Sequence, residues 1–91
     1  MEENLKKQHS LYLENRNGLK LTGVTDVEFF DEETVSAFTD YGLITVSGSS
    51  LQVEELNLET GLLEVSGEVT ALVYSSKTKK EKNILKRFFS A

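Results

Sequence analysis

The stretch that decides the fold is residues 42–74, GLITVSGSSLQVEELNLETGLLEVSGEVTALVY. It consists of short runs rich in Val, Leu and Thr, and Gly, Ser or Asn stands where one run gives way to the next. Runs of this length and composition are typical of β-strands, and no 3.6-residue apolar period continues over three helical turns. The stretch therefore predicts consecutive strands that pair with one another.

The same pattern continues towards the N-terminus and predicts an all-β fold. We expect about eight short strands, at residues 11–15, 19–22, 24–30, 34–39, 43–47, 51–58, 62–66 and 68–74. Proline is absent from the chain, so no strand is demoted by a missing backbone donor.

A short motif recurs three times and predicts where the sheet bends. Residues 19–23, 44–48 and 63–67 share the pattern apolar-x-apolar-hydroxyl-Gly. Glycine inside or between strands marks a sharp bend or a close backbone approach, so we expect strands to change layer at these glycines. The copies are few and unevenly spaced, which favours a small antiparallel roll or sandwich; a β-solenoid-like stack is the alternative.

Two hairpin registers follow from the apolar pattern. Pairing Leu13 with Leu21 sets Glu14 opposite Lys20 and leaves a three-residue loop in which Gly18 takes a positive φ. Pairing Leu58 with Leu63 gives the second register, with a turn around residues 59–62. The apolar alternation slips at residues 54–55, which predicts a β-bulge there.

Length and composition limit the class of protein. A chain of 91 residues is one small domain. It has no cysteine, which removes disulfides and thiol chemistry. No run approaches the roughly 18 apolar residues of a membrane-spanning helix, and the N-terminus lacks the apolar core of a signal peptide. We expect a soluble intracellular domain.

Charge divides the chain into three parts. Residues 1–9 are balanced and are expected to be a flexible segment. Residues 10–76, the β domain, carry twelve acidic and two basic residues, a net charge of −10. Residues 77–91 carry six basic residues and one acidic residue, a net charge of +5. An acidic body with a basic tail predicts docking to another surface.

The basic tail carries the candidate docking residues. On a helix, its four large apolar side chains fall within about 140°, with most of the basic ones opposite. The candidate residues are Lys82, Ile84, Leu85, Lys86, Arg87, Phe88 and Phe89. An anionic membrane surface or membrane protein, another protein, the chain's own acidic body and a merely solubilising tail all stay open. Nucleic acid is disfavoured, because the acidic body repels a phosphate backbone.

No catalytic, metal or cofactor site is expected. His9, the lone histidine, has no partner in sequence and is expected to be solvated or at a strand edge. Residues 31–33 and 47–50 are expected to form turns. Asp26 and Glu28 lie on the solvent side of a strand. A ligand-binding or regulatory domain, the rival function, would need a polar pocket lined by residues such as Asp26, Glu28 or Tyr41.

Residues 10–76 resemble the YabP/YqfC family of sporulation proteins from endospore-forming bacteria. The resemblance rests on Leu19-x-Leu-Thr-Gly-Val-x-x-Val-Glu-x-Phe-Asp and on Gly61-x-Leu-x-Val-x-Gly-x-Val-x-x-Leu-x-Tyr74, with a third run between them. These positions are mostly apolar or glycine, so they mark a fold and not a site. The Phe88–Phe89 pair after a lysine run looks more like the YabP branch.

The resemblance implies a non-enzymatic assembly or scaffold factor that acts late in spore formation. It implies synthesis in the mother cell, a cytoplasmic location that is peripheral at the forespore membrane, and a role where cortex and coat are assembled. The implied partners are other sporulation proteins, with a membrane protein or anionic membrane among the options. Self-association through strand edges is a further expectation.

Overall fold

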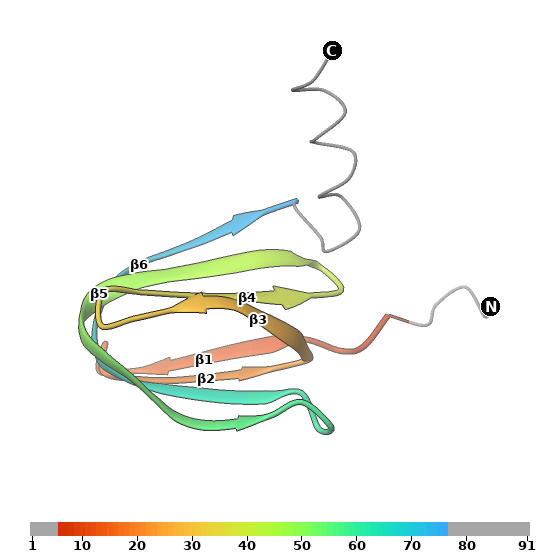
Figure 1. Cartoon of the computed structure of the whole chain (residues 1–91), viewed down its shortest axis with the longest axis horizontal. Coiled ribbons are helices and arrows are strands. Elements are labelled where there is room, and N and C mark those ends of the chain that lie inside the picture. The colour runs from red at the N-terminus through yellow and green to blue at the C-terminus, as the bar shows by residue number, and fades with distance from the viewer. Residues whose placement is uncertain (1–5, 77–91) are drawn as a thin grey trace, which may run out of the picture.

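A computed structural model describes residues 6–76, which form six β-strands. Every neighbouring pair is antiparallel, and the order in the single sheet is β1-β2-β6-β5-β4-β3 (Figure 1). The strands are β1 (Ser10–Glu14), β2 (Gly18–Thr22), β3 (Val24–Phe30), β4 (Thr34–Thr39), β5 (Gly42–Asn57) and β6 (Leu62–Ser75). The all-β prediction is confirmed, whereas the solenoid-like stack is not.

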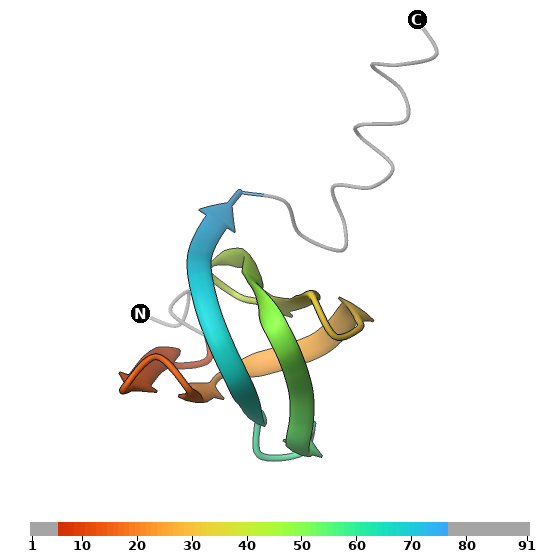
Figure 2. The same cartoon turned by 90° about the vertical axis from the view of Figure 1, so that its left-hand side faces the viewer.

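The sheet folds over on itself because its two longest strands take part in two layers (Figures 1 and 2). In the upper layer, the first half of β5 lies between β4 and the second half of β6, and β3 pairs with β4 at the edge. In the lower layer, the first half of β6 lies between β2 and the second half of β5, and β1 forms the edge. Each layer is therefore built from a hairpin and two half-strands.

The hydrophobic core lies between the two layers. Its most buried side chains include Leu21 and Leu63 from the lower layer and Ile44 and Val46 from the upper layer. Successive side chains of a strand point to opposite faces, so alternate residues face this core, as Val35 and Ala37 do in β4. Complete burial of one such side chain stabilises the fold by about 1.5–3 kcal/mol.

β5 and β6 pass from one layer to the other at Gly48 and Gly67, the second and third glycines of the repeated motif. A Cβ on Gly48 would collide with the Glu68 carbonyl oxygen, and a Cβ on Gly67 would collide with that of Ser50. Gly67 also has a φ of 117°. The prediction of close backbone approaches at these glycines is confirmed.

The predicted count of eight strands is wrong. The segments expected at residues 43–47 and 51–58 are one strand, β5, and those expected at 62–66 and 68–74 are one strand, β6. Residues 47–50, expected to be a turn, lie within β5. Pairing with β6 continues through the bend by register shifts around Gly48. Glycine lets a strand bend sharply while it keeps its hydrogen bonds to the neighbouring strand. The positions where we expected one strand to end and the next to begin are therefore bends within a single strand.

The first predicted register is displaced by two residues. Leu13 pairs with Leu19, and Leu11 pairs with Leu21. The turn begins one residue earlier than expected, because Asn15 and Arg16 take positive φ values of 53° and 59° in place of Gly18. A slip of two residues preserves the faces, so the leucines still point to the core.

The second predicted register is also displaced by two residues, since Leu63 pairs with Leu56. The Asn57 side chain accepts hydrogen bonds from the backbone N–H groups of Glu59 and Thr60, at 3.0 and 3.2 Å, which starts the turn early. Gly61 completes the turn with a φ of 80°. The predicted bulge is confirmed, because the register shifts between Val53 and Glu55.

Candidate functional site

The two edges of the folded sheet leave two seams, and one of them is open. In the described ladders, β3 pairs only with β4, and residues 52–57 of β5 pair only with β6. Hydrogen bonds tie the two ends of this seam: Val24 N–H donates to Gly61 O at 2.9 Å, and Leu51 N–H donates to Glu32 O at 2.9 Å. We call the region between β3 and residues 52–57 the open seam.

Core-facing side chains are left uncovered at the open seam. Phe30 is cross-strand to the buried Val35 and is 58% exposed. Leu56 is cross-strand to the buried Leu63 and is 42% exposed. A groove of about 610 Å³ lies here, lined by Phe30, Asp31, Glu32, Leu51, Gln52, Val53 and Glu54. Exposed strand edges beside apolar side chains are suited to accept an additional strand.

The open seam is acidic. Asp31 and Glu32 stand at one side of the groove, and Glu54 stands at the other. The Glu54 carboxylate accepts a hydrogen bond from Ser66 Oγ at 2.6 Å. A segment that enters this groove is therefore favoured if it is basic.

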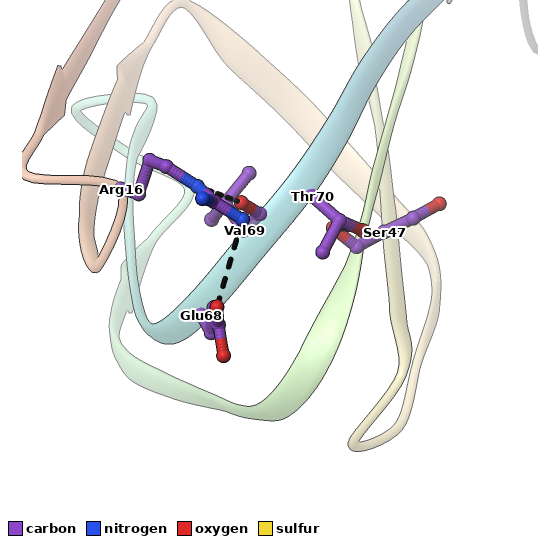
Figure 3. Close-up of polar contacts among 5 residues, drawn as sticks. All are labelled: Arg16, Ser47, Glu68, Val69 and Thr70. Atoms are coloured by element: carbon purple, nitrogen blue, oxygen red, sulfur yellow. Dashed lines mark hydrogen bonds and ion pairs between the residues drawn. The ribbon is translucent and has the colours of Figure 1, made fainter.

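The second seam, between β1 and the second half of β6, is bridged by Arg16 in the β1–β2 turn (Figure 3). Val69 N–H donates to Arg16 O at 2.8 Å, and Arg16 Nε donates to Val69 O at 3.1 Å. The guanidinium also lies 3.6 Å from the Glu68 carboxylate, a largely solvent-exposed ion pair. These contacts hold the bend of β6 at the point where it leaves the lower layer.

The other end of the second seam is bridged by His9. Nδ1 of His9 lies 2.7 Å from Thr22 O and donates to that carbonyl, which can only accept, and Nε2 lies 2.6 Å from the Tyr74 hydroxyl. Burial raises the pKa of the Tyr74 hydroxyl. His9 is therefore a structural clamp that is half-buried at a strand edge.

Aromatic rings gather at the end of the molecule where the described chain stops. His9 stacks on Tyr41 with ring centroids 6.4 Å apart, and Lys6 Nζ lies 4.8 Å from the centre of the Tyr41 ring. Tyr41 and Tyr74 line a hollow of about 420 Å³ that reaches Ser76. We call this surface the aromatic end.

The structure separates the residues that a polar ligand pocket would need. Tyr41 lies at the aromatic end, whereas Asp26 and Glu28 lie on β3, where Glu28 accepts a hydrogen bond from Ser36 Oγ at 3.1 Å. Within residues 6–76, no group of three or more His, Cys, Asp or Glu side chains is placed to hold a metal ion. In the same residues, no helix is long and apolar enough to cross a membrane.

The acidic run is a turn, as predicted. One carboxylate oxygen of Asp31 accepts hydrogen bonds from Glu33 N–H at 2.8 Å and Thr34 N–H at 2.9 Å. The backbone of this turn also holds the β5 bend, because Glu33 O accepts from Gly48 N–H at 3.0 Å.

The predicted docking residues, Lys82, Ile84, Leu85, Lys86, Arg87, Phe88 and Phe89, lie outside the described residues. Sequence reasoning missed the open seam. Its signal in the sequence is limited to Leu56, an apolar residue next to two acidic ones; Phe30 shares its strand phase with Asp26 and Glu28 and faces the core side only through the bulges of β3. Which of two edges stays uncovered depends on long-range pairing that a local pattern does not contain.

These features define an all-β roll with an open, acidic strand edge. The model of the YabP family matches residues 5–81 of the chain. The chain is also 36% identical over 84 residues to the spore protein YabP of Bacillus subtilis (strain 168), an alignment that covers 92% of this chain and 82% of that protein. The chain belongs to the YabP family, which confirms the resemblance drawn from its motifs.

Proposed function

We propose that this protein is a non-enzymatic assembly factor that acts late in spore formation, at the forespore surface on the mother-cell side. Its similarity to a spore protein supports a role in sporulation. The observation that carries the assembly role is the open seam, where core-facing Phe30 and Leu56 are exposed beside strand edges without a described ladder partner. Such a surface recognises a partner and needs no catalytic group.

The partner at the open seam is an extended, basic segment of another sporulation protein. Backbone hydrogen bonds to β5 would supply affinity, and apolar side chains on alternate positions would cover Leu56 and Leu58. Pairing of two copies through β5 is disfavoured, because an antiparallel pair centred on Glu54 and Glu55 sets acids opposite acids. The charge of the seam therefore selects a different protein over a second copy.

The C-terminal tail supplies a second contact, with an anionic membrane or a membrane protein. It follows Ser76, so it leaves the body at the aromatic end, beside the exposed Tyr41 and Tyr74 rings. Aromatic rings and lysines are suited to a membrane–water interface. The body would thus be held peripherally at the forespore membrane while the seam stays available.

Co-sedimentation with liposomes tests the membrane contact. The full chain is compared with a chain ending at Ser76 and with a Phe88→Ser/Phe89→Ser variant, on anionic and neutral vesicles at low and high salt. We expect only the full chain to sediment, only with anionic vesicles, and less at high salt. If the full chain does not sediment, the contact with lipid is wrong.

Substitution at the open seam tests the assembly role. Phe30→Ser and Leu56→Ser are introduced into the chromosomal copy, and Tyr12→Ser, an exposed aromatic on the outside of the lower layer, is the matched control. We expect fewer heat-resistant spores from the seam variants only, with unchanged circular dichroism of the purified proteins. Normal spore yield from folded seam variants would contradict the role.

A further inference from the structure

The outer side of the upper layer is apolar, although it faces away from the core. Ala37 and Ile44 point to the core, so their neighbours along β4 and β5 point outward. The register gives a small, mostly polar outward row, Thr34–Ser47–Ala71, and beside it two rows that carry large apolar side chains: Phe29–Ser36–Thr45–Val73 and Asp26–Phe38–Leu43–Ser75. We call the surface formed by these two rows the outer face.

The outer face is unlike the outside of the lower layer. Phe38 and Leu43 are buried, yet neither belongs to the core cluster between the layers. Phe29 and Val73 beside them are 50% and 57% exposed. The corresponding row of the lower layer is Tyr12–Lys20–Glu64–Glu55, which is mostly charged, as an ordinary solvent face is. An apolar face of this kind marks an interaction surface.

The position of residues 77–91 in the chain favours them as the segment that covers the outer face. Ser75 is the last residue of β6 and ends the second row, so residues 77–91 begin at the border of the outer face. The layer is four strands wide, about 14 Å from β6 to β3. If helical, as the sequence predicts, fifteen residues measure about 22 Å, which is enough to cross the layer.

The chemistry of the two surfaces is complementary. The tail offers Ile84, Leu85, Phe88 and Phe89 on one helical side, and its net charge is +5. The outer face offers apolar side chains, and β3 brings the carboxylates of Asp26 and Glu28 to its far border. A second copy of the body, with its net charge of −10, would instead bring acids against acids.

We propose that residues 77–91 dock across the outer face of their own chain. Their apolar side chains would cover the exposed Phe29 and Val73, which flank the buried Phe38 and Leu43, and their basic residues would lie near the acidic β3 border. The same apolar side chains would serve the membrane contact, so the two sites compete for one segment. The tail is then released only where it binds an anionic surface more tightly than it binds the outer face.

Paramagnetic NMR tests this docking directly. The chain has no cysteine, so Ser90→Cys provides one attachment point for a nitroxide spin label in the full-length protein. We expect selective loss of amide signal intensity at Phe29, Thr45 and Val73, and no loss at Lys20 and Glu64 on the lower layer. The loss should persist on dilution and disappear in the labelled Phe88→Ser/Phe89→Ser variant.

Two outcomes would overturn the inference. One is an intensity loss that is absent or spread evenly over both layers. The other is a loss that appears only when labelled chains are mixed with isotopically enriched, unlabelled chains, since the occupant would then be a second copy. The inference does not rest on the proposed function, because no membrane is present: docking without liposome binding would remove only the membrane contact.

Discussion

At the scale of single residues, the fold depends on backbone approaches that only glycine permits. Gly48 and Gly67 lie where β5 and β6 cross between layers, and at each a carbonyl oxygen of the neighbouring strand occupies the space of a Cβ. At Gly18, by contrast, a Cβ would lie 3.9 Å from Glu14 O, which is ordinary van der Waals contact, and the φ is not positive. The two kinds of glycine should respond differently to the same methyl group.

Gly67→Ala is expected to lower the free energy of unfolding by at least about 2 kcal/mol, because the methyl group meets backbone and the φ is left-handed. Gly18→Ala is the matched control and should change it by less than about 1 kcal/mol, in the stabilising direction if at all. Urea denaturation followed by circular dichroism measures both. Equal urea midpoints for the two variants would show that the backbones of β5 and β6 do not approach closely at Gly67.

Replacing core-facing leucines by alanine should lower the free energy of unfolding by a large amount where the leucine is buried and by a small amount at the open seam. Leu63→Ala is expected to cost about 2–5 kcal/mol, because the side chain is fully buried. Leu56→Ala, directly cross-strand at the open seam, should cost less than about 1.5 kcal/mol, since part of its surface is already in water. A cost for Leu56→Ala as large as that for Leu63→Ala would mean that the seam is closed in solution.

At the scale of elements, the sequence predicts strand faces better than strand limits. The core residues of β2 and β6 follow from the alternation of leucine and valine with polar residues. Both hairpin registers are displaced by two residues because the turns start early. Asn15 takes the positive φ that is expected of Gly18, and the Asn57 side chain accepts a hydrogen bond from the Glu59 N–H. The choice between those residues depends on a few tenths of a kcal/mol, which no local pattern resolves.

The strand count is wrong for a related reason. A glycine that ends a strand and a glycine that bends one have the same local sequence, and only the presence of a partner strand distinguishes them. The tail residues were proposed from charge and amphipathicity, whereas the open seam needed the strand order β1-β2-β6-β5-β4-β3 to be known.

The β1–β2 turn should act as a clamp on β6 through one side chain. Arg16→Ala removes the hydrogen bond from Nε to Val69 O and is expected to cost about 1 kcal/mol of unfolding free energy. Glu68→Gln removes only the exposed ion pair and should change the value by less than about 0.5 kcal/mol. If the two variants lose equal stability, the ion pair and not the backbone contact holds the turn.

At the scale of the whole molecule, the body holds the core that the structure describes. All members of the core cluster lie between Leu19 and Val69, and both seams are formed by residues of the body. Acidic side chains surround an apolar groove on this body, and the basic tail leaves from the aromatic end. On the proposed function, the groove and the tail would be two surfaces by which one small domain holds two partners at once.

A chain that ends at Ser76 should therefore still fold. We expect the same β circular dichroism spectrum and a single cooperative urea transition, with a midpoint somewhat below that of the full chain because the outer face has lost its cover. Loss of the cooperative transition would show that the tail is part of the core.

The most direct test of the central claim, that the protein assembles at the forespore surface, is its position in sporulating cells. An N-terminal fluorescent fusion of the full chain is imaged beside the same fusion ending at Ser76. The account predicts that the full chain surrounds the forespore and that the shortened chain spreads through the mother cell. A full chain that stays evenly distributed throughout sporulation would contradict the claim.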